Sequence, residues 1–244
     1  MIVMSIAGVD PSGGAGVFAD LKTFQAIGVY GTGIVTALTA QNPYKFFSTL
    51  PVSEEYIEAQ IDAVIEAYEV NFIKTGMLYS PEIIKLVARK VKEYDLKAVV
   101  DPVMVATSGG DLTKEDIAKA MNKYLLPKAI LTTPNVAEAE KLTGIAINSK
   151  EDAIKASEKI ICDSIVTGGH LDGNNIININ GEITIEKQEL IETDNLHGTG
   201  CNLSSAITAH LAKGNDLKTS ILKSLDYVYE GIKNGNYGTL IAKI

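Results

Sequence analysis

The sequence predicts an α/β protein in which helices cover both faces of a largely parallel sheet. Short apolar runs alternate with segments of helical periodicity along almost the whole chain, which is the pattern of such a sheet. A chain of 244 residues with 46% apolar residues can also bury a substantial core. The alternation is interrupted at one segment, where Asn180-Gly181 separates two β-prone runs and indicates a hairpin.

The elements of the first half follow from apolar periodicity and turn residues. The run IVMSIA predicts a buried strand, and Gly28 is expected to end the helix behind it. Ser80-Pro81 marks the start of a further helix, because proline is favoured in a first helical turn. The expected elements are strands over 2–7, 71–76 and 97–101 and helices over 15–27, 54–69, 81–94 and 114–125.

The second half continues the alternation. Gly144 and Gly214 each follow a periodic segment and are expected to end its helix. The expected elements are strands over 129–133 and 164–169, the hairpin within 174–190, and helices over 135–143, 150–161 and 203–211. No internal repeat, low-complexity tract or linker is found, so residues 1–244 are expected to form a single domain. The last 30 residues carry no motif.

Composition excludes several classes of function. The formal charge of -8 and the pI near 5.0 argue against nucleic acid as a partner, since binding it without sequence preference needs a basic face. The two cysteines are too few for a disulfide scaffold and fit a reducing compartment. The N-terminal stretch has no basic region, and no apolar run is long enough to span a membrane. A cytoplasmic protein without membrane contact is therefore expected.

Polar or glycine-rich stretches follow the predicted strands. Ligands of open α/β sheets bind outside the carboxyl ends of the strands. The stretches expected at that edge are GVDPSGGAG, TGM, DPVMVATSGG, TPNVAE, TGGH and HGTGC. Six such loops at one edge predict a binding site there.

The familiar nucleotide-binding motifs do not explain these loops. The chain has no G-x-x-x-x-G-K-[ST] sequence, which excludes a P-loop. The run GAGVFA matches a loose dinucleotide fingerprint, but no acidic residue lies between Asp20 and Glu54 to hold a ribose. The stretch HGTGC is more informative. It resembles a glycine turn that opens a helix, where free backbone N–H groups and the helix dipole favour an anion.

Two acidic positions have alternative interpretations. Asn135 and Glu138 lie one turn apart at the start of a predicted helix, where they could form a capping box. They could instead hold hydrated Mg²⁺, which takes one or two protein carboxylates together with substrate phosphates. Asp101 is either a turn residue before Pro102 or a second acidic group near a metal-bound phosphate.

Other residues of these loops also have both a structural and a ligand-binding interpretation. Thr167 and Gly169 follow a strand and either form a bend or let phosphate approach the backbone. Met77 is either a core residue or a soft contact for an aromatic ligand. His170 and His197 lie in loops without the spacing of metal ligands, and His210 lies within a helix.

Taken together, the stretches resemble the hydroxymethylpyrimidine/phosphomethylpyrimidine kinases of thiamine biosynthesis, a family of the ribokinase-like superfamily. The resemblance runs in unbroken order from Val3 to about Gly214. The stretches that carry it are SIAGVDPSGGAGVFADLKTFQAIGVYGTGIVTALTAQN, IKTGM, VVDPVMVATSGG, TPNVAEAEKL, GGH and NLHGTGC. It implies a three-layer α/β/α fold and two ATP-dependent phosphorylations. The first acts on 4-amino-5-hydroxymethyl-2-methylpyrimidine and the second on its monophosphate.

The resemblance also implies roles for particular positions. The residues expected to meet the pyrimidine are Gly8, Asp20, Gln41, Met77 and Val103. Those expected to form the anion hole for the transferred phosphoryl group are Gly198, Thr199, Gly200 and Cys201. The residues expected to contact ATP are Asn135, Thr167 and Gly169, and those expected to bind Mg²⁺ are Glu138 and Asp101. Cys201 stands where other ribokinase-like enzymes place an aspartate base, and a helix N-terminus would lower the pKa of its thiol. Cys201 is either that base or a residue that only fits the pocket while Mg²⁺ and the backbone amides do most of the catalysis.

The chain departs from the family at two positions, since Thr107 and Thr167 stand where lysines are frequent. Losing either cation would weaken phosphate neutralisation. ATP and a small-molecule substrate are the expected ligands, with a homodimer as the expected assembly. A pyridoxal/pyridoxine kinase is the close alternative. A non-catalytic pyrimidine-binding protein is the alternative of another class, although such a protein would not need Asp101, Asn135, Glu138 or the glycines of the anion hole.

Overall fold

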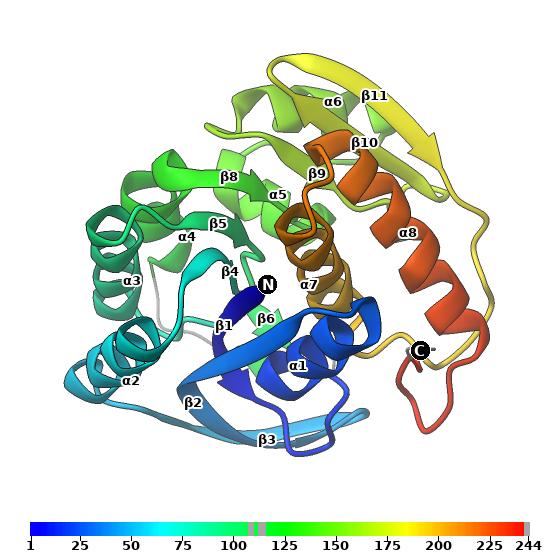
Figure 1. Ribbon diagram of the computed structural model, residues 1–244. Coiled ribbons are helices and arrows are strands. Elements are labelled where there is room, and N and C mark those ends of the chain that lie inside the picture. The colour runs from blue at the N-terminus through cyan, green and yellow to red at the C-terminus, as the bar shows by residue number, and fades with distance from the viewer. Residues whose placement is uncertain (107–109, 112–115, 242–244) are drawn as a thin grey trace.

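The computed structural model describes residues 1–106, 110–111 and 116–241. A nine-stranded sheet forms its centre, in the spatial order β11-β10-β9-β8-β5-β4-β1-β2-β3 (Figure 1). The six parallel strands are β1 (Ile2–Val9), β2 (Tyr30–Asn42), β4 (Val70–Thr75), β5 (Lys97–Val100), β8 (Ala129–Thr132) and β9 (Ser164–Val166). The antiparallel strands are β3 (Lys45–Pro51) on one side and β10 (Asn174–Ile179) with β11 (Glu182–Lys187) on the other.

Helices cover both faces of the sheet, which makes three layers (Figure 1). One face carries α1 (Gly16–Ile27), α7 (Thr199–Ala212) and α8 (Leu217–Lys233). The other face carries α2 (Glu54–Ala67), α3 (Pro81–Glu93), α4 (Ile117–Ala120), α5 (Val136–Thr143) and α6 (Lys150–Lys159). Shorter elements are the β6 (Val105–Ala106) and β7 (Gly110–Asp111) pair, a π-helical turn over Met121–Leu125, and 3-10 turns over Leu126–Lys128 and Gly168–His170.

The two faces of the sheet are built from alternate residues of the same strands. Val99 of β5 packs with Leu203 and Ile207 of α7 in one buried cluster. Its neighbours Ala98 and Val100 belong to the cluster beneath α2, α3 and α4. Successive side chains of a strand point to opposite faces of the sheet. A strand whose apolar residues do not alternate with polar ones is therefore expected to be buried on both faces, as found here.

Most expected elements are confirmed, with four differences. The hairpin of β2 and β3 and helix α8 were not expected from the sequence. The helix expected over 203–211 already begins at Thr199, so its first turn contains the glycine-rich stretch. The helix expected over 114–125 is confined to 117–120 and continues as a π-helical turn; residues 114–115 lie outside the described part of the chain.

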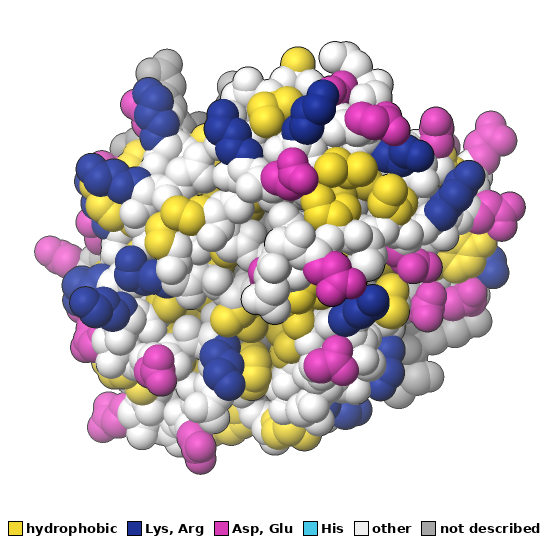
Figure 2. All heavy atoms as spheres, turned by 90° about the horizontal axis from the view of Figure 1, so that it is seen from above, with side chains coloured by type: hydrophobic (Ala, Val, Ile, Leu, Met, Phe, Trp, Pro, Cys, Tyr) yellow, Lys and Arg dark blue, Asp and Glu magenta, His cyan; other side chains and the backbone are white. Residues whose placement is uncertain are grey.

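The surface seen from above the view of Figure 1 mixes acidic and basic side chains, with small apolar patches between them (Figure 2). Among the described residues, no helix is both long and apolar enough to cross a membrane.

Candidate functional site

The glycine-rich loops gather at one edge of the sheet, as the sequence predicts. Because β1, β4, β5, β8 and β9 are parallel members of one sheet, their carboxyl ends point to the same side. The first turn of α7 lies at the same edge, where a Cβ built on Gly200 would come 4.0 Å from Asp101 Oδ2. The candidate site therefore lies between these strand ends and the N-terminus of α7.

A buried lysine underlies this edge. Lys74 of β4 has no exposed surface, and its Nζ lies 2.8 Å from Asp20 Oδ1 and 3.9 Å from Asp101 Oδ2. Burial alone would lower the Lys74 pKa, but the charges of Asp20 and Asp101 raise it above its usual value. Sequence reasoning missed this residue, although a lysine inside the apolar strand "NFIKTG" signals an internal charge partner.

Asp20, expected to meet the pyrimidine, lies on the buried side of α1. Its Oδ1 accepts hydrogen bonds from Lys74 Nζ at 2.8 Å and Ser205 Oγ at 2.7 Å, and its Oδ2 accepts one from Ser5 Oγ. Both oxygens thus have partners within the protein. Direct contact with a ligand stays a prediction, whereas the role that the geometry gives Asp20 is to neutralise Lys74.

Asp101 follows β5 and is 3% exposed. Its carboxylate accepts a hydrogen bond from Ser204 Oγ at 3.2 Å. Burial raises the Asp101 pKa; the charge of Asp20 adds to this effect, while Lys74 opposes it. The site therefore holds an acidic group that a nearby cation would stabilise in its charged form.

The expected lowering of the Cys201 pKa is wrong. Cys201 is partly exposed as a residue, yet the protein around its sulfur raises the pKa of the thiol to about 12. Burial is the first cause; the charge of Lys74 opposes it, and the charges of Asp101 and Asp20 add to it. The N-terminal position in α7 does not overcome these neighbours. Cys201 is a neutral thiol at physiological pH.

The turn before α7 requires glycine. Gly198 is the N-cap with a φ of 83°, and a Cβ there would come 1.7 Å from the carbonyl oxygen of Gly14. The loop after β1 and the first turn of α7 are therefore in direct backbone contact. No side chain caps this helix end. The Thr199 N–H donates to the Leu196 carbonyl at 3.3 Å, and Gly200 of the same turn lies near Asp101.

Asn135 and Glu138 form the capping box that their spacing allows. Asn135 Oδ1 accepts from the Glu138 N–H at 2.9 Å, and Glu138 Oε2 accepts from the Asn135 N–H at 3.0 Å. Burial, followed by the charge of Asp101, raises the Glu138 pKa to about 8. Within the described residues, no group of three or more His, Cys, Asp or Glu side chains is arranged as a metal site. The capping interpretation is confirmed, and the metal interpretation stays a prediction.

The expected ATP side lies at the ends of β8 and β9. The Thr167 N–H donates to the carbonyl of Pro134 at 3.0 Å, which places Thr167 beside the start of α5. A Cβ built on Gly169 would meet no atom within 4 Å, so this residue faces open space. Thr107, the other position where the family often has lysine, lies outside the described residues.

The expected pyrimidine contacts lie near the β2–β3 hairpin. A Cβ on Gly8 would come 3.0 Å from Met77 Sδ, and Met77 packs with Val103 and Phe46. Gln41 is the cross-strand partner of Phe46. The structure thus brings Gly8, Met77 and Val103 together and places Gln41 on the adjoining hairpin. Sequence reasoning missed Phe46, because the hairpin that carries it was not expected.

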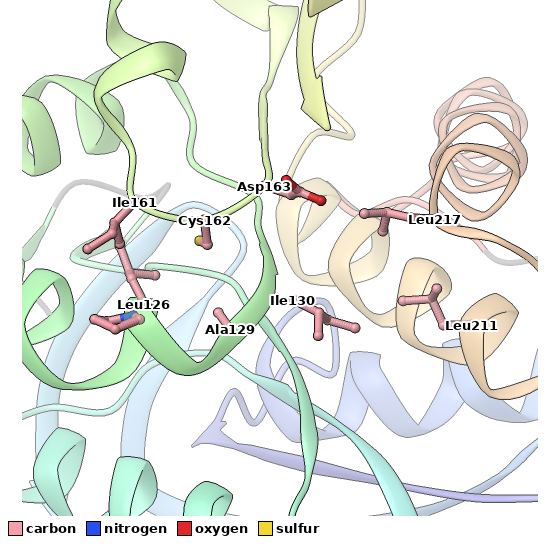
Figure 3. A pocket seen from close by; sticks show the side chains of 9 residues that line it. Leu126, Ala129, Ile130, Ile161, Cys162, Asp163, Leu211 and Leu217 are labelled. Carbon is pink, nitrogen blue, oxygen red and sulfur yellow. The ribbon is translucent and has the colours of Figure 1, made fainter. Parts of the chain in front are cut away.

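A separate cavity of about 400 Å³ lies at the amino ends of β8 and β9, opposite to the candidate site (Figure 3). Its lining side chains come from the 3-10 turn before β8, from β8 itself, from the loop before β9 and from α7 and α8; they include Leu126, Ile130, Cys162, Leu211 and Leu217. None of the expected site residues lines it.

Comparison with known proteins agrees with this geometry. The model of the phosphomethylpyrimidine kinase family matches residues 10–241. A hydroxymethylpyrimidine/phosphomethylpyrimidine kinase of Rhizobium meliloti is 42% identical over 239 residues, which cover 95% of this chain and 90% of the relative.

Solved structures give the same result. A Clostridium difficile phosphomethylpyrimidine kinase matches with a TM-score of 0.84 and 39% identity, covering 95% of this chain and 99% of that one. An ADP complex of Bacillus subtilis pyridoxal kinase matches with a TM-score of 0.91 and 34% identity, covering 99% and 96% of the two chains. The expected ribokinase-like fold, with a mostly parallel sheet between two helical layers, is confirmed. The chain belongs to the phosphomethylpyrimidine kinase family.

Proposed function

We propose that the protein transfers the terminal phosphoryl group of ATP to 4-amino-5-hydroxymethyl-2-methylpyrimidine and then to the resulting monophosphate. The observation that carries the proposal is the uncapped N-terminus of α7, which lies beside Asp101 at the carboxyl edge of the sheet in a chain of this family. The relatives named for both reactions and the ADP bound by a structural relative support it. We place the reaction in cytoplasmic thiamine biosynthesis.

Backbone groups of α7 are proposed to hold the transferred phosphoryl group. Gly198, Gly200 and Cys201 would direct N–H groups at the charge that develops on its oxygens, and the helix dipole adds to this field. The Thr199 N–H, which donates to the Leu196 carbonyl, would have to exchange that partner to join them. Cys201 contributes through its backbone, because its raised pKa leaves the thiol protonated. Phosphoryl transfer depends chiefly on positioning and charge stabilisation, so a side-chain base of low pKa is not required.

Glu138 and Asp101 fit a magnesium ion that accompanies the phosphates. Both carboxyls are buried, and the charge of Asp101 is among the causes that raise the Glu138 pKa. A divalent cation beside them would remove this mutual repulsion, and Mg²⁺ takes one or two carboxylates together with phosphates and water. Bound there, the ion would neutralise charge on the transferring phosphates. Asn135 orients the Glu138 backbone from the other side of the capping box.

The remaining expected contacts divide between the two substrates. The Gln41 amide offers a carbonyl and an NH₂ group, which can pair with a ring nitrogen and an exocyclic amine of the pyrimidine. Gly8, Met77 and Val103 would provide its apolar surroundings. On the nucleotide side, Thr167 and the open Gly169 leave room for ATP beside Asn135.

Pyridoxal is the second candidate substrate. The observation that favours it is the TM-score of 0.91 with a Bacillus subtilis pyridoxal kinase, higher than the 0.84 with the Clostridium difficile phosphomethylpyrimidine kinase. Pyridoxal also carries a hydroxymethyl group on an aromatic nitrogen heterocycle, so the same edge of the sheet could present it to ATP.

The first prediction concerns the substrate. Purified protein with ATP and Mg²⁺ is expected to convert the hydroxymethylpyrimidine to its monophosphate and then to its diphosphate. Mass spectrometry of the reaction mixture measures both products. Phosphorylation of pyridoxal alone would contradict the proposal and favour the second candidate. Pyrimidine binding without any product would instead favour the non-catalytic alternative.

The second prediction separates the two roles of Glu138. Glu138→Gln keeps a side-chain acceptor for the Asn135 N–H but removes the charge, so the free energy of unfolding should stay near that of the wild type. Turnover should fall sharply at limiting Mg²⁺. Glu138→Ala is the matched control, which should also lose about 1 kcal/mol of stability with the cap. Wild-type turnover of Glu138→Gln at limiting Mg²⁺ would leave Glu138 with only its capping role.

The third prediction concerns Cys201. Cys201→Ala should keep more than about a tenth of the wild-type rate, because positioned proton transfer usually contributes about 10²- to 10⁴-fold and the thiol does not supply it. Since the thiol pKa of about 12 lies above the assay range, both proteins should give the same pH–rate profile between about pH 6 and 9. A larger loss in Cys201→Ala that Cys201→Asp restores, with the acidic limb moved to lower pH, would instead establish a base at this position.

The fourth prediction concerns assembly, which we propose to be a homodimer through the outer face of the β2–β3 hairpin. Leu38 and Leu50 are cross-strand partners there, 48% and 64% exposed, and Phe47 of the same hairpin is 59% exposed. β3 is an edge strand, and exposed apolar patches of this kind mark interfaces. Light scattering should give a dimer for the wild type and a monomer for Leu50→Lys. Ile185→Lys on the opposite edge strand β11 should stay dimeric. A monomeric wild type would contradict this assembly.

A further inference from the structure

A buried acid–histidine pair joins two loops at the edge of the site. Asp10 follows β1, and His197 precedes the N-cap of α7, 187 positions further along the chain. His197 Nε2 lies 2.7 Å from Asp10 Oδ2, and the two side chains are 5% and 1% exposed. None of the roles proposed above uses either residue.

Asp10 shapes the glycine-rich loop in which it stands. Its carboxylate accepts hydrogen bonds from the Ser12 N–H at 2.9 Å, from Ser12 Oγ at 2.8 Å and from the Ala15 N–H at 2.9 Å. Burial would raise the Asp10 pKa, but the hydrogen bonds from His197 and Ser12 hold it below its usual value. The carboxylate is therefore ionised and can only accept, so His197 must donate through its Nε2–H.

His197 connects this loop to two further segments. Its backbone continues into Gly198, whose position is fixed by contact with the Gly14 carbonyl. Its N–H donates to the Gly238 carbonyl at 3.2 Å, in the segment after α8. A Cβ built on Gly14 would come 2.7 Å from His197 Cδ2, so the imidazole packs directly on the loop after β1. His197 Nδ1 is buried and has no hydrogen-bond partner among the described residues.

We propose that Asp10 and His197 are positioning residues, which hold the loop after β1 and the first turn of α7 in one fixed arrangement for phosphoryl transfer. The inference rests on the proposed function. The pair acts at Nε2 alone, because no partner engages Nδ1 within the described chain. Its removal would let Gly198 and the N–H groups of α7 shift against the loop that carries Gly14. A displacement of about 1 Å can cost about 10²-fold in rate.

The test compares two replacements of His197 that differ in one hydrogen bond. His197→Gln can place an amide N–H near the position of Nε2, whereas His197→Leu has similar bulk without a donor. We expect His197→Leu to lose about 10²-fold in kcat with little change in the KM for the pyrimidine, and His197→Gln to recover most of that loss. Asp10→Asn with His197→Leu should be no slower than the slower single variant, because the two residues act as one unit.

Two measurements separate this inference from the proposed function. In wild-type protein labelled with ¹⁵N, His197 should be the Nε2–H tautomer, a signal easily assigned because the chain has three histidines. The affinity of the ATP analogue AMP-PCP should fall in His197→Leu more than that of ADP, because only the analogue places a third phosphorus group near α7. An inactive wild type that gives both results contradicts the proposed function alone. Unchanged kcat in His197→Leu, equal losses in both variants, or an Nδ1–H tautomer would overturn the positioning role.

Discussion

The burial of Lys74 between Asp20 and Asp101 is the constraint on which the arrangement of the site depends. A charged ammonium without exposed surface is tolerated only with close, well-oriented anions, and removing one partner of such a group typically costs about 3–5 kcal/mol. Lys74 belongs to β4, Asp20 to α1, and Asp101 follows β5. The Lys74 ammonium therefore joins helix α1 to strands β4 and β5 at the carboxyl edge of the sheet.

The charges of Asp20, Asp101 and Lys74 also affect the position of α7 and the pKa values of nearby side chains. Ser204 and Ser205 of α7 donate to Asp101 and Asp20, so the position of this helix is set by carboxylates that Lys74 keeps in place. Burial and the charges of Asp101 and Asp20 raise the pKa of the Cys201 thiol, so the proposed anion site would depend on backbone N–H groups of α7. Burial and the charge of Asp101 also raise the pKa of Glu138. In a chain of net charge -8, the proposed phosphate site would therefore rely on backbone amides and a bound cation, while the buried Lys74 is neutralised by Asp20.

The sequence predicted the elements well where the signals are local, and failed where they are tertiary. Apolar periodicity and capping residues are local, so the parallel strands, most helices and the capping box of Asn135 and Glu138 could be foreseen. The β2–β3 hairpin turns at Asn42, whose Oδ1 accepts from the N–H groups of Tyr44 and Lys45, instead of through an Asn-Gly pair. The helix N-terminus at Cys201 suggested a low thiol pKa, but burial, together with carboxylates from distant parts of the chain, raises the pKa instead. No spacing rule could connect Asp10 to His197.

The contact between His197 and the Gly238 carbonyl has a consequence for synthesis on the ribosome. Domains form progressively as the chain emerges, and the strands that carry the glycine-rich loops are complete long before residue 238 is made. The first turn of α7, however, is anchored at Gly238, which is made after all of these strands. A nascent chain can thus assemble the sheet before the contact that anchors the start of α7 can form.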